Sequence, residues 1–142
     1  MNEGELAKFP LLAPLTDAER AAVADEFEAL EVGPGSPLFR EGEAADAALF
    51  IVAGRVRVHA RRVGAEAELG PGDVLGMLSL VVDGPREASA ETSSPTRIWR
   101  LSRSAFRRLV EAEPAAACRL LEGILREYAG AVREEVSRDG CG

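Results

Sequence analysis

The chain has 142 residues, of which 46% are hydrophobic and 29% charged, and this balance is typical of one soluble domain that buries its own core. Its formal net charge of -7 opposes the phosphate backbone of DNA and RNA, so we expect no direct nucleic acid partner. No apolar run approaches the ~18 residues of a membrane helix, and the N-terminus lacks a secretory signal pattern, so we expect a cytoplasmic protein without membrane association.

The first predicted element is a helix over about 17–29. Thr16 and Glu19 have the spacing of a capping box, in which each side chain accepts a backbone amide of the other residue. Val23, Phe27 and Leu30 then recur at helical spacing, and Gly33-Pro34-Gly35 ends the segment.

A β-rich region of short strands is predicted over about 36–101, because apolar runs alternate there with glycine, proline and aspartate. The runs are 38–40, 47–53, 55–60, 65–69, 74–75, 87–91 and 97–101. Such short, evenly spaced runs favour a sandwich or barrel. The alternation of residues 55–59 predicts that Val56 and Val58 are buried and that His59 faces water.

Helices are predicted again over about 103–138. Ser102 is a candidate cap, and Pro114 suits the first turn of a last, long helix. An apolar stripe on that helix contains Leu121, Leu125, Tyr128, Val132 and Val136. This stripe can pack against the barrel, form a homodimer seam with a second chain, or be divided between both roles.

Catalytic and metal-binding patterns are not found in the sequence. Cys118 and Cys141 lack the clustered spacing of a zinc site, and we interpret them as reduced thiols. The chain has one histidine and contains neither a Gly-x-Ser-x-Gly motif nor a phosphate-loop lysine. We therefore expect no catalytic residues, no metal and no enzymatic activity.

Four segments resemble the cyclic-nucleotide-binding domains of catabolite activator proteins and protein kinase A regulatory subunits. They are Gly33–Glu43, Ala48–Val58, Leu69–Gly76 and Gly84–Arg86, and the order of the flanking helices also matches. The resemblance implies a mainly β fold, a double-stranded β-helix or jelly-roll barrel, with an N-terminal helix and a long C-terminal helix. It also implies a single regulatory domain with cAMP or cGMP as its ligand.

An anion site is predicted around Gly76 and Arg86. Gly76 precedes a short segment that can turn helical and direct free amides outward, and Arg86 follows ten positions later. A guanidinium grips a phosphate with two charged hydrogen bonds. The resemblance implies that Arg86, Leu78 and Ser79 hold the cyclic phosphate. The candidate ligand-binding residues are Gly76, Met77, Leu78, Ser79, Arg86, Glu87 and Ala88.

Two positions depart from the family pattern. Met77 stands where the family has a glutamate that accepts the ribose hydroxyl, and losing such a bond costs ~1.5–3 kcal/mol. Glu87 stands where a small or hydroxylic residue is usual, and it either faces the pocket and pairs with Arg86 or points to the opposite face. The departures leave a weak nucleotide site, a site for another anionic ligand, or a pocket without a ligand.

Two functions follow from this reading. In the first, the domain is a ligand-responsive regulatory module, and its C-terminal helix closes over the base near Leu125 or Tyr128. In the second, it is a nucleotide-independent module for dimerisation or protein interaction. The resemblance favours the first.

Overall fold

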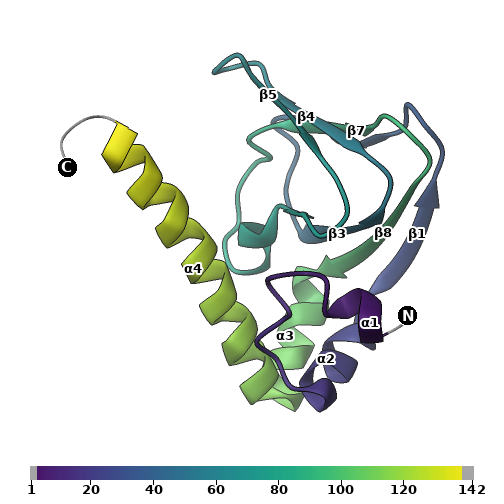
Figure 1. Ribbon diagram of the computed structural model, residues 1–142, viewed down its shortest axis with the longest axis vertical. Helices are drawn as coiled ribbons and strands as arrows, with labels where there is room; N and C mark the ends of the chain where they lie inside the picture. The colour runs from purple at the N-terminus through teal and green to yellow at the C-terminus, as the bar shows by residue number, and fades with distance from the viewer. Residues whose placement is uncertain (1–2, 139–142) are drawn as a thin grey trace.

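The computed structural model describes residues 3–138, and side chains within 5–130, as a jelly roll of two four-stranded antiparallel sheets (Figure 1). The first sheet has the order β1 (Glu28–Val32), β8 (Thr96–Ser102), β3 (Ala47–Ala53) and β6 (Val74–Leu75). The second has the order β2 (Pro37–Phe39), β7 (Ser89–Thr92), β4 (Val56–Ala60) and β5 (Ala65–Leu69). The predicted mainly β jelly roll with flanking helices is confirmed.

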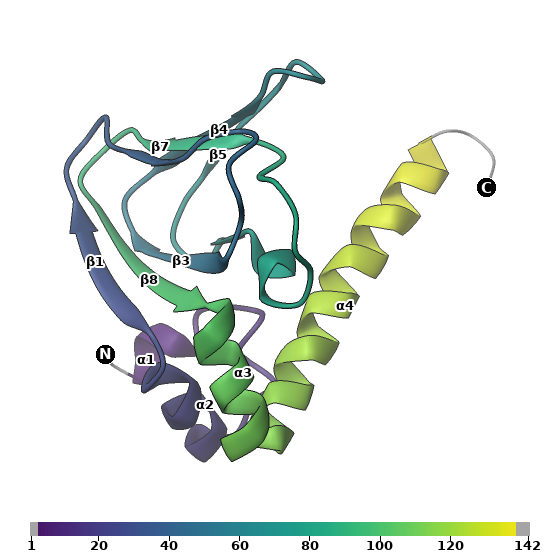
Figure 2. The same cartoon turned by 180° about the vertical axis from the view of Figure 1, so that it is seen from behind.

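Helices gather at one end of the barrel. They are α1 (Glu3–Leu6), α2 (Asp17–Ala24), α3 (Arg103–Ala112) and α4 (Pro114–Arg138), and a short 3-10 helix, η1 (Met77–Leu80), follows β6. The predicted cap of α3 is present, because Ser102 Oγ accepts the amide of Ala105 at 3.1 Å. Helix α4 rises from this layer past the open side of the barrel (Figures 1 and 2). None of the described helices is long and apolar enough to cross a membrane.

The first predicted helix is too long. The capping box at Thr16 and Glu19 is present, but the helix ends at Ala24, and residues 28–32 form strand β1 on β8. Phe27 and Leu30 continue the helical spacing, yet Phe27 packs in the core after the helix and Leu30 faces the barrel interior. Pairing with β8 satisfies the backbone groups of 28–32, so tertiary contact overrides the local pattern.

The strands 47–53, 65–69 and 74–75 have the predicted bounds, and the other predicted runs differ from theirs by one or two residues at an end. Within β4, Val56 is buried and Arg57 exposed, as the alternation predicts, whereas Val58 is only half-buried. The prediction for His59 is wrong, because this side chain is half-buried and its Nδ1 is buried without a hydrogen-bond partner within the described residues.

Strand β3 divides the core in two. Ala48 and Phe50 face the helical layer, whereas Leu49 and Ile51 face the interior of the barrel. Both faces are therefore buried, which explains the uninterrupted apolar run of this strand. The cavities of the domain lie on the barrel side of this strand.

Candidate ligand-binding site

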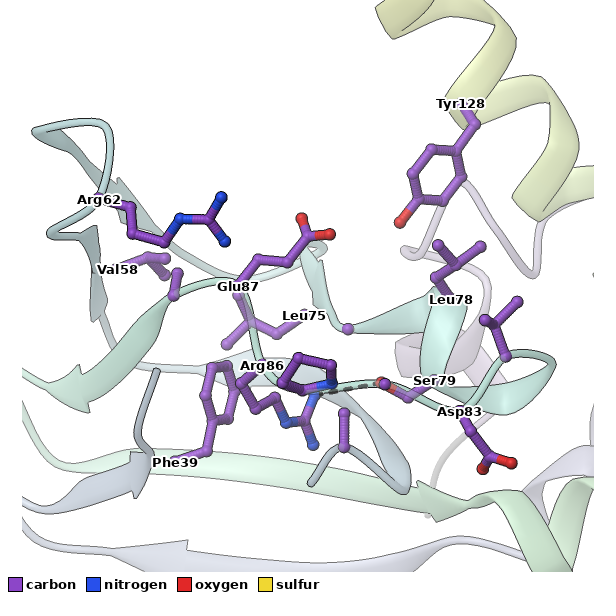
Figure 3. Close-up of a pocket in the computed structure, with 16 residues that line it drawn as sticks. Phe39, Val58, Arg62, Leu75, Leu78, Ser79, Asp83, Arg86, Glu87 and Tyr128 are labelled. Atoms are coloured by element: carbon purple, nitrogen blue, oxygen red, sulfur yellow. Dashed lines mark hydrogen bonds between the residues drawn. The ribbon is translucent and has the colours of Figure 1, made fainter. Parts of the chain in front are cut away.

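A pocket of about 500 Å³ opens between the barrel, η1, the segment 82–88 and α4 (Figure 3). Six of the seven candidate residues from the sequence line it, namely Gly76, Leu78, Ser79, Arg86, Glu87 and Ala88. The volume falls within the roughly 300–1,000 Å³ of small-molecule sites. The pocket also has lining residues that the sequence did not indicate, among them Phe39, Arg62 and Val82.

Arg86 forms the inner wall of the pocket and is only 9% exposed. Its Nη2 donates to the carbonyl oxygen of Ala47 at 3.0 Å, and its Nη1 donates to Ser79 Oγ at 3.4 Å. The guanidinium carbon lies 4.2 Å from the centroid of the Phe39 ring, and Nε is buried with no partner among the described residues. Burial lowers the pKa of this guanidinium below its usual value.

The backbone of Arg86 is fixed from both sides by the loop that precedes β3. Its amide donates to the carbonyl of Glu43 at 2.6 Å, and its carbonyl accepts the amide of Gly42 at 2.8 Å. One residue earlier, Pro85 pairs with Ala44 in an isolated bridge. The backbone from which the Arg86 side chain extends is therefore held by main-chain contacts.

Gly76 makes the close approach to Arg86 possible. Its φ is +69°, which favours glycine, and a Cβ built there would lie 2.2 Å from Arg86 Nη1. The same Cβ would lie 3.3 Å from the carbonyl oxygen of Ala47. Gly76 thus starts η1 and also leaves the space in which the guanidinium sits.

Met77 is the candidate residue that does not line the pocket. It is half-buried and packs against the core formed by the helical layer. Its apolar side chain thus contributes to packing beneath η1 and not to the surface of the pocket.

Glu87 lies at the mouth of the pocket, and its carboxylate points away from Arg86, toward the space between Arg62 and Tyr128 (Figure 3). The structure matches neither sequence alternative in full, because Glu87 lines the pocket but its carboxylate is directed away from Arg86 (Figure 3). Tyr128, on α4, is 40% exposed. Burial first, and the charge of Glu87 second, raise the pKa of its phenol.

Arg103, at the start of α3, ties the loop after η1 to the helical layer. Its guanidinium donates to the carbonyls of Ser79 at 2.8 Å and Ala45 at 2.6 Å, and it forms a 2.5 Å ion pair with Asp83. No sequence motif indicates this residue, because its partners are main-chain carbonyls and one carboxylate from segments distant in the sequence.

The sequence relatives of the chain include regulatory subunits of cAMP-dependent protein kinases. The chain is 34% identical over 111 residues to a cAMP-dependent protein kinase regulatory subunit of Aspergillus fumigatus, a match that covers 78% of this chain and 27% of that protein. It is 30% identical over 137 residues to the corresponding subunit of Neurospora crassa, covering 96% of this chain and 34% of that one. The chain thus spans about a quarter to a third of the length of these relatives.

Solved structures with the same fold include domains of transcriptional regulators. The N-terminal domain of a transcriptional regulator from Streptomyces coelicolor A3(2) has a TM-score of 0.80 and 26% identity, covering 92% of this chain and 94% of that one. Thermus thermophilus catabolite activator protein has a TM-score of 0.76 and 28% identity, covering 92% and 63%. The family model described as "Cyclic nucleotide-binding domain" matches residues 29–113, and the chain belongs to this family.

Proposed function

We propose that the domain is a regulatory module that binds a cyclic nucleotide, with the cyclic phosphate against Arg86, Ser79 and Gly76. The observation that carries this proposal is a buried guanidinium with an unpartnered Nε on the inner wall of the pocket. An unpaired buried cation is costly, and an anionic ligand would supply the missing charge and acceptors. Family membership makes a cyclic nucleotide the first choice for this anion.

The outer part of the pocket suits a sugar and base. Leu78 and Val82, two exposed lining residues, provide apolar surface. Tyr128 places an aromatic ring from α4 at the same opening as Leu78 (Figure 3). Tyr128 is the only described lining residue from that helix. Ligand contact with its ring would favour a position of α4 closer to the barrel, so occupancy of the pocket would be transmitted by the helix. No catalytic step is part of this proposal.

The test is titration calorimetry with cAMP and with cGMP on the wild type, Arg86→Ala and Arg107→Ala. In Arg86→Ala, the loss of charge-assisted bonds to the phosphate should weaken binding by about 10- to 150-fold. Arg107 is exposed on α3 and lies outside the pocket, so its variant should bind as the wild type does. No heat of binding at millimolar ligand in the wild type would reject the proposal and favour the nucleotide-independent module.

We also propose that α4 contributes to a homodimer. Leu125 is 68% exposed, although it belongs to the predicted apolar stripe, while Val132 and Val136 lie outside the residues whose side chains are described. A second chain that covers Leu125 would remove this apolar surface from water. Light scattering should show a dimer for the wild type and a monomer for Leu125→Glu. Val110→Glu, which adds the same charge at an exposed valine of α3, should remain dimeric.

A further inference from the structure

Two charged side chains at the mouth of the pocket lie away from the proposed phosphate position beside Arg86. Glu87 and Arg62 both line the pocket, and both lie on the side of the 85–88 segment opposite the buried guanidinium of Arg86 (Figure 3). A ligand with its phosphate on the inner wall would therefore present its other end to one carboxylate and one guanidinium. The two groups differ in kind, because an ionised carboxylate only accepts hydrogen bonds and a guanidinium only donates them.

The backbone of Arg62 is anchored by a side chain from another segment, and its own side chain is exposed. The Glu41 carboxylate accepts the amide of Arg61 at 2.9 Å and that of Arg62 at 3.4 Å. These bonds connect the turn between β4 and β5 to the segment that follows β2. The amide of Glu41 in turn donates to Ser89 Oγ at 2.9 Å, next to the segment that carries Glu87. The turn bearing Arg62 and the segment bearing Glu87 are thus connected through Glu41.

We infer that Glu87 and Arg62 select a guanine base, so that the domain prefers cGMP to cAMP. This inference rests on the proposed function. Guanine presents two adjacent donors, N1–H and the 2-amino group, and both can bond to one carboxylate in parallel. Its O6 and N7 are acceptors, which suit the guanidinium of Arg62. Adenine offers a carboxylate a single amino donor, next to the N1 lone pair that repels the second carboxylate oxygen.

The charges at the mouth also favour a neutral base edge over a second phosphate. Glu87 is negative and Arg62 positive, and the further lining carboxylate, Asp83, is paired with Arg103. The mouth therefore has no net positive charge to attract an anion, in contrast to the inner wall with Arg86. A nucleoside cyclic monophosphate has one anionic end and one neutral end with donors and acceptors. The pocket therefore matches it in a single orientation, with the phosphate inside and the base outside.

Competition binding with cGMP, cIMP and cAMP tests this inference. Cyclic IMP keeps N1–H and O6 but lacks the 2-amino group, so it isolates one of the two bonds to Glu87. We expect the wild type to bind cGMP at least about tenfold more tightly than cAMP, with cIMP between them. Glu87→Ala should remove the difference between cGMP and cIMP, and Arg62→Ala should weaken both without restoring cAMP.

Matched controls are Arg61→Ala, on the neighbouring residue of the same turn, and Glu68→Ala, at an exposed position of β5; neither lines the pocket. Both should keep the wild-type order of affinities. Wild-type binding of cAMP as tight as that of cGMP, or an equal change of all three affinities in Glu87→Ala, would overturn the base selection and leave the cyclic-nucleotide module standing. Failure of the wild type to bind any of the three would overturn the proposed function itself, and the base selection with it.

Discussion

The two sides of strand β3 show two ways of filling a protein interior. On the helical side, Phe50 meets Phe9 and Phe27 at ring centroid distances of 5.2 Å and 4.9 Å, and Trp99 packs beside the same two rings. On the barrel side, smaller aliphatic residues surround the pocket of about 500 Å³ and a second cavity of about 280 Å³, and Arg86 lines both.

Because of this difference, we expect the helical side to contribute mainly to stability and the barrel side mainly to ligand binding. Closely packed rings contribute burial and edge contacts but leave no room for a ligand. In the barrel interior, the residues around the cavities make fewer packing contacts, and the guanidinium of Arg86 is buried at an energetic cost. Because the two interiors share only the strands between them, substitutions on either side should affect different properties of the domain.

The largest effect is expected from Trp99→Ala. Trp99 is buried on the helical face of β8, and its removal should cost about 3–5 kcal/mol of unfolding free energy. Ile98, the preceding residue, points to the barrel side and lines the second cavity, so Ile98→Ala should cost only about 2 kcal/mol, at the low end for such truncations. Urea unfolding measures both. Equal costs would mean that the barrel interior is as tightly packed as the helical side.

Gly76→Ala should damage binding more than stability. The alanine would have to adopt a φ near +69°, which costs about 1–3 kcal/mol, and its Cβ would displace the Arg86 guanidinium from its place beside η1. Nucleotide affinity should fall at least about tenfold, because the charged bonds to the phosphate are lost.

Gly35→Ala separates the two parts of this effect. Gly35 has a similar φ of +74°, but no heavy atom lies within 4 Å of its added Cβ. Its variant should lose comparable stability in thermal unfolding and keep full nucleotide affinity in calorimetry. A Gly76→Ala protein that binds as well as Gly35→Ala would show that the position of Arg86 does not depend on the glycine.

Arg86→Met should leave the stability of the ligand-free domain within about 1 kcal/mol of the wild type. The substitution removes a buried charge, which is favourable, but it deprives the carbonyl of Ala47 of its hydrogen bond, which costs about 1–3 kcal/mol. The two contributions have opposite signs and similar size. Chemical denaturation without ligand measures the free energy of unfolding. A decrease of more than about 3 kcal/mol would show that Arg86 mainly stabilises the fold.

The parts of the fold that depend on local pattern were predictable. Strand β3 was placed at its observed bounds, because burial on both faces requires the continuous apolar run 47–53. The helix over 17–29 was too long, since Phe27 and Leu30 match helical spacing for unrelated reasons. The alternation of Leu30 and Val32, both half-buried in β1, was the signal for a strand.

The site was predictable only where motif and chemistry coincide. Gly76, Ser79 and Arg86 were identified from their spacing and the family resemblance, and the structure brings them together. The sequence also named Tyr128 as a candidate near the base, and it lines the pocket, whereas Leu125 does not. Arg62 and Phe39 could not be predicted as lining residues, because their place at the pocket depends on how distant strands pack.

The smallest predicted effect concerns Tyr128, the only tyrosine of the chain, whose ionisation can be followed in the ultraviolet spectrum without interference from another phenol. Burial is the larger cause of its raised pKa, and the negative charge of Glu87 is the smaller one. Glu87→Gln should therefore lower the pKa of this phenol while leaving it above the usual value. Glu68→Gln, outside the pocket, should leave it unchanged. An unaltered pKa in Glu87→Gln would place the carboxylate away from the phenol, and a fall to the usual value would show that α4 leaves the ring in water.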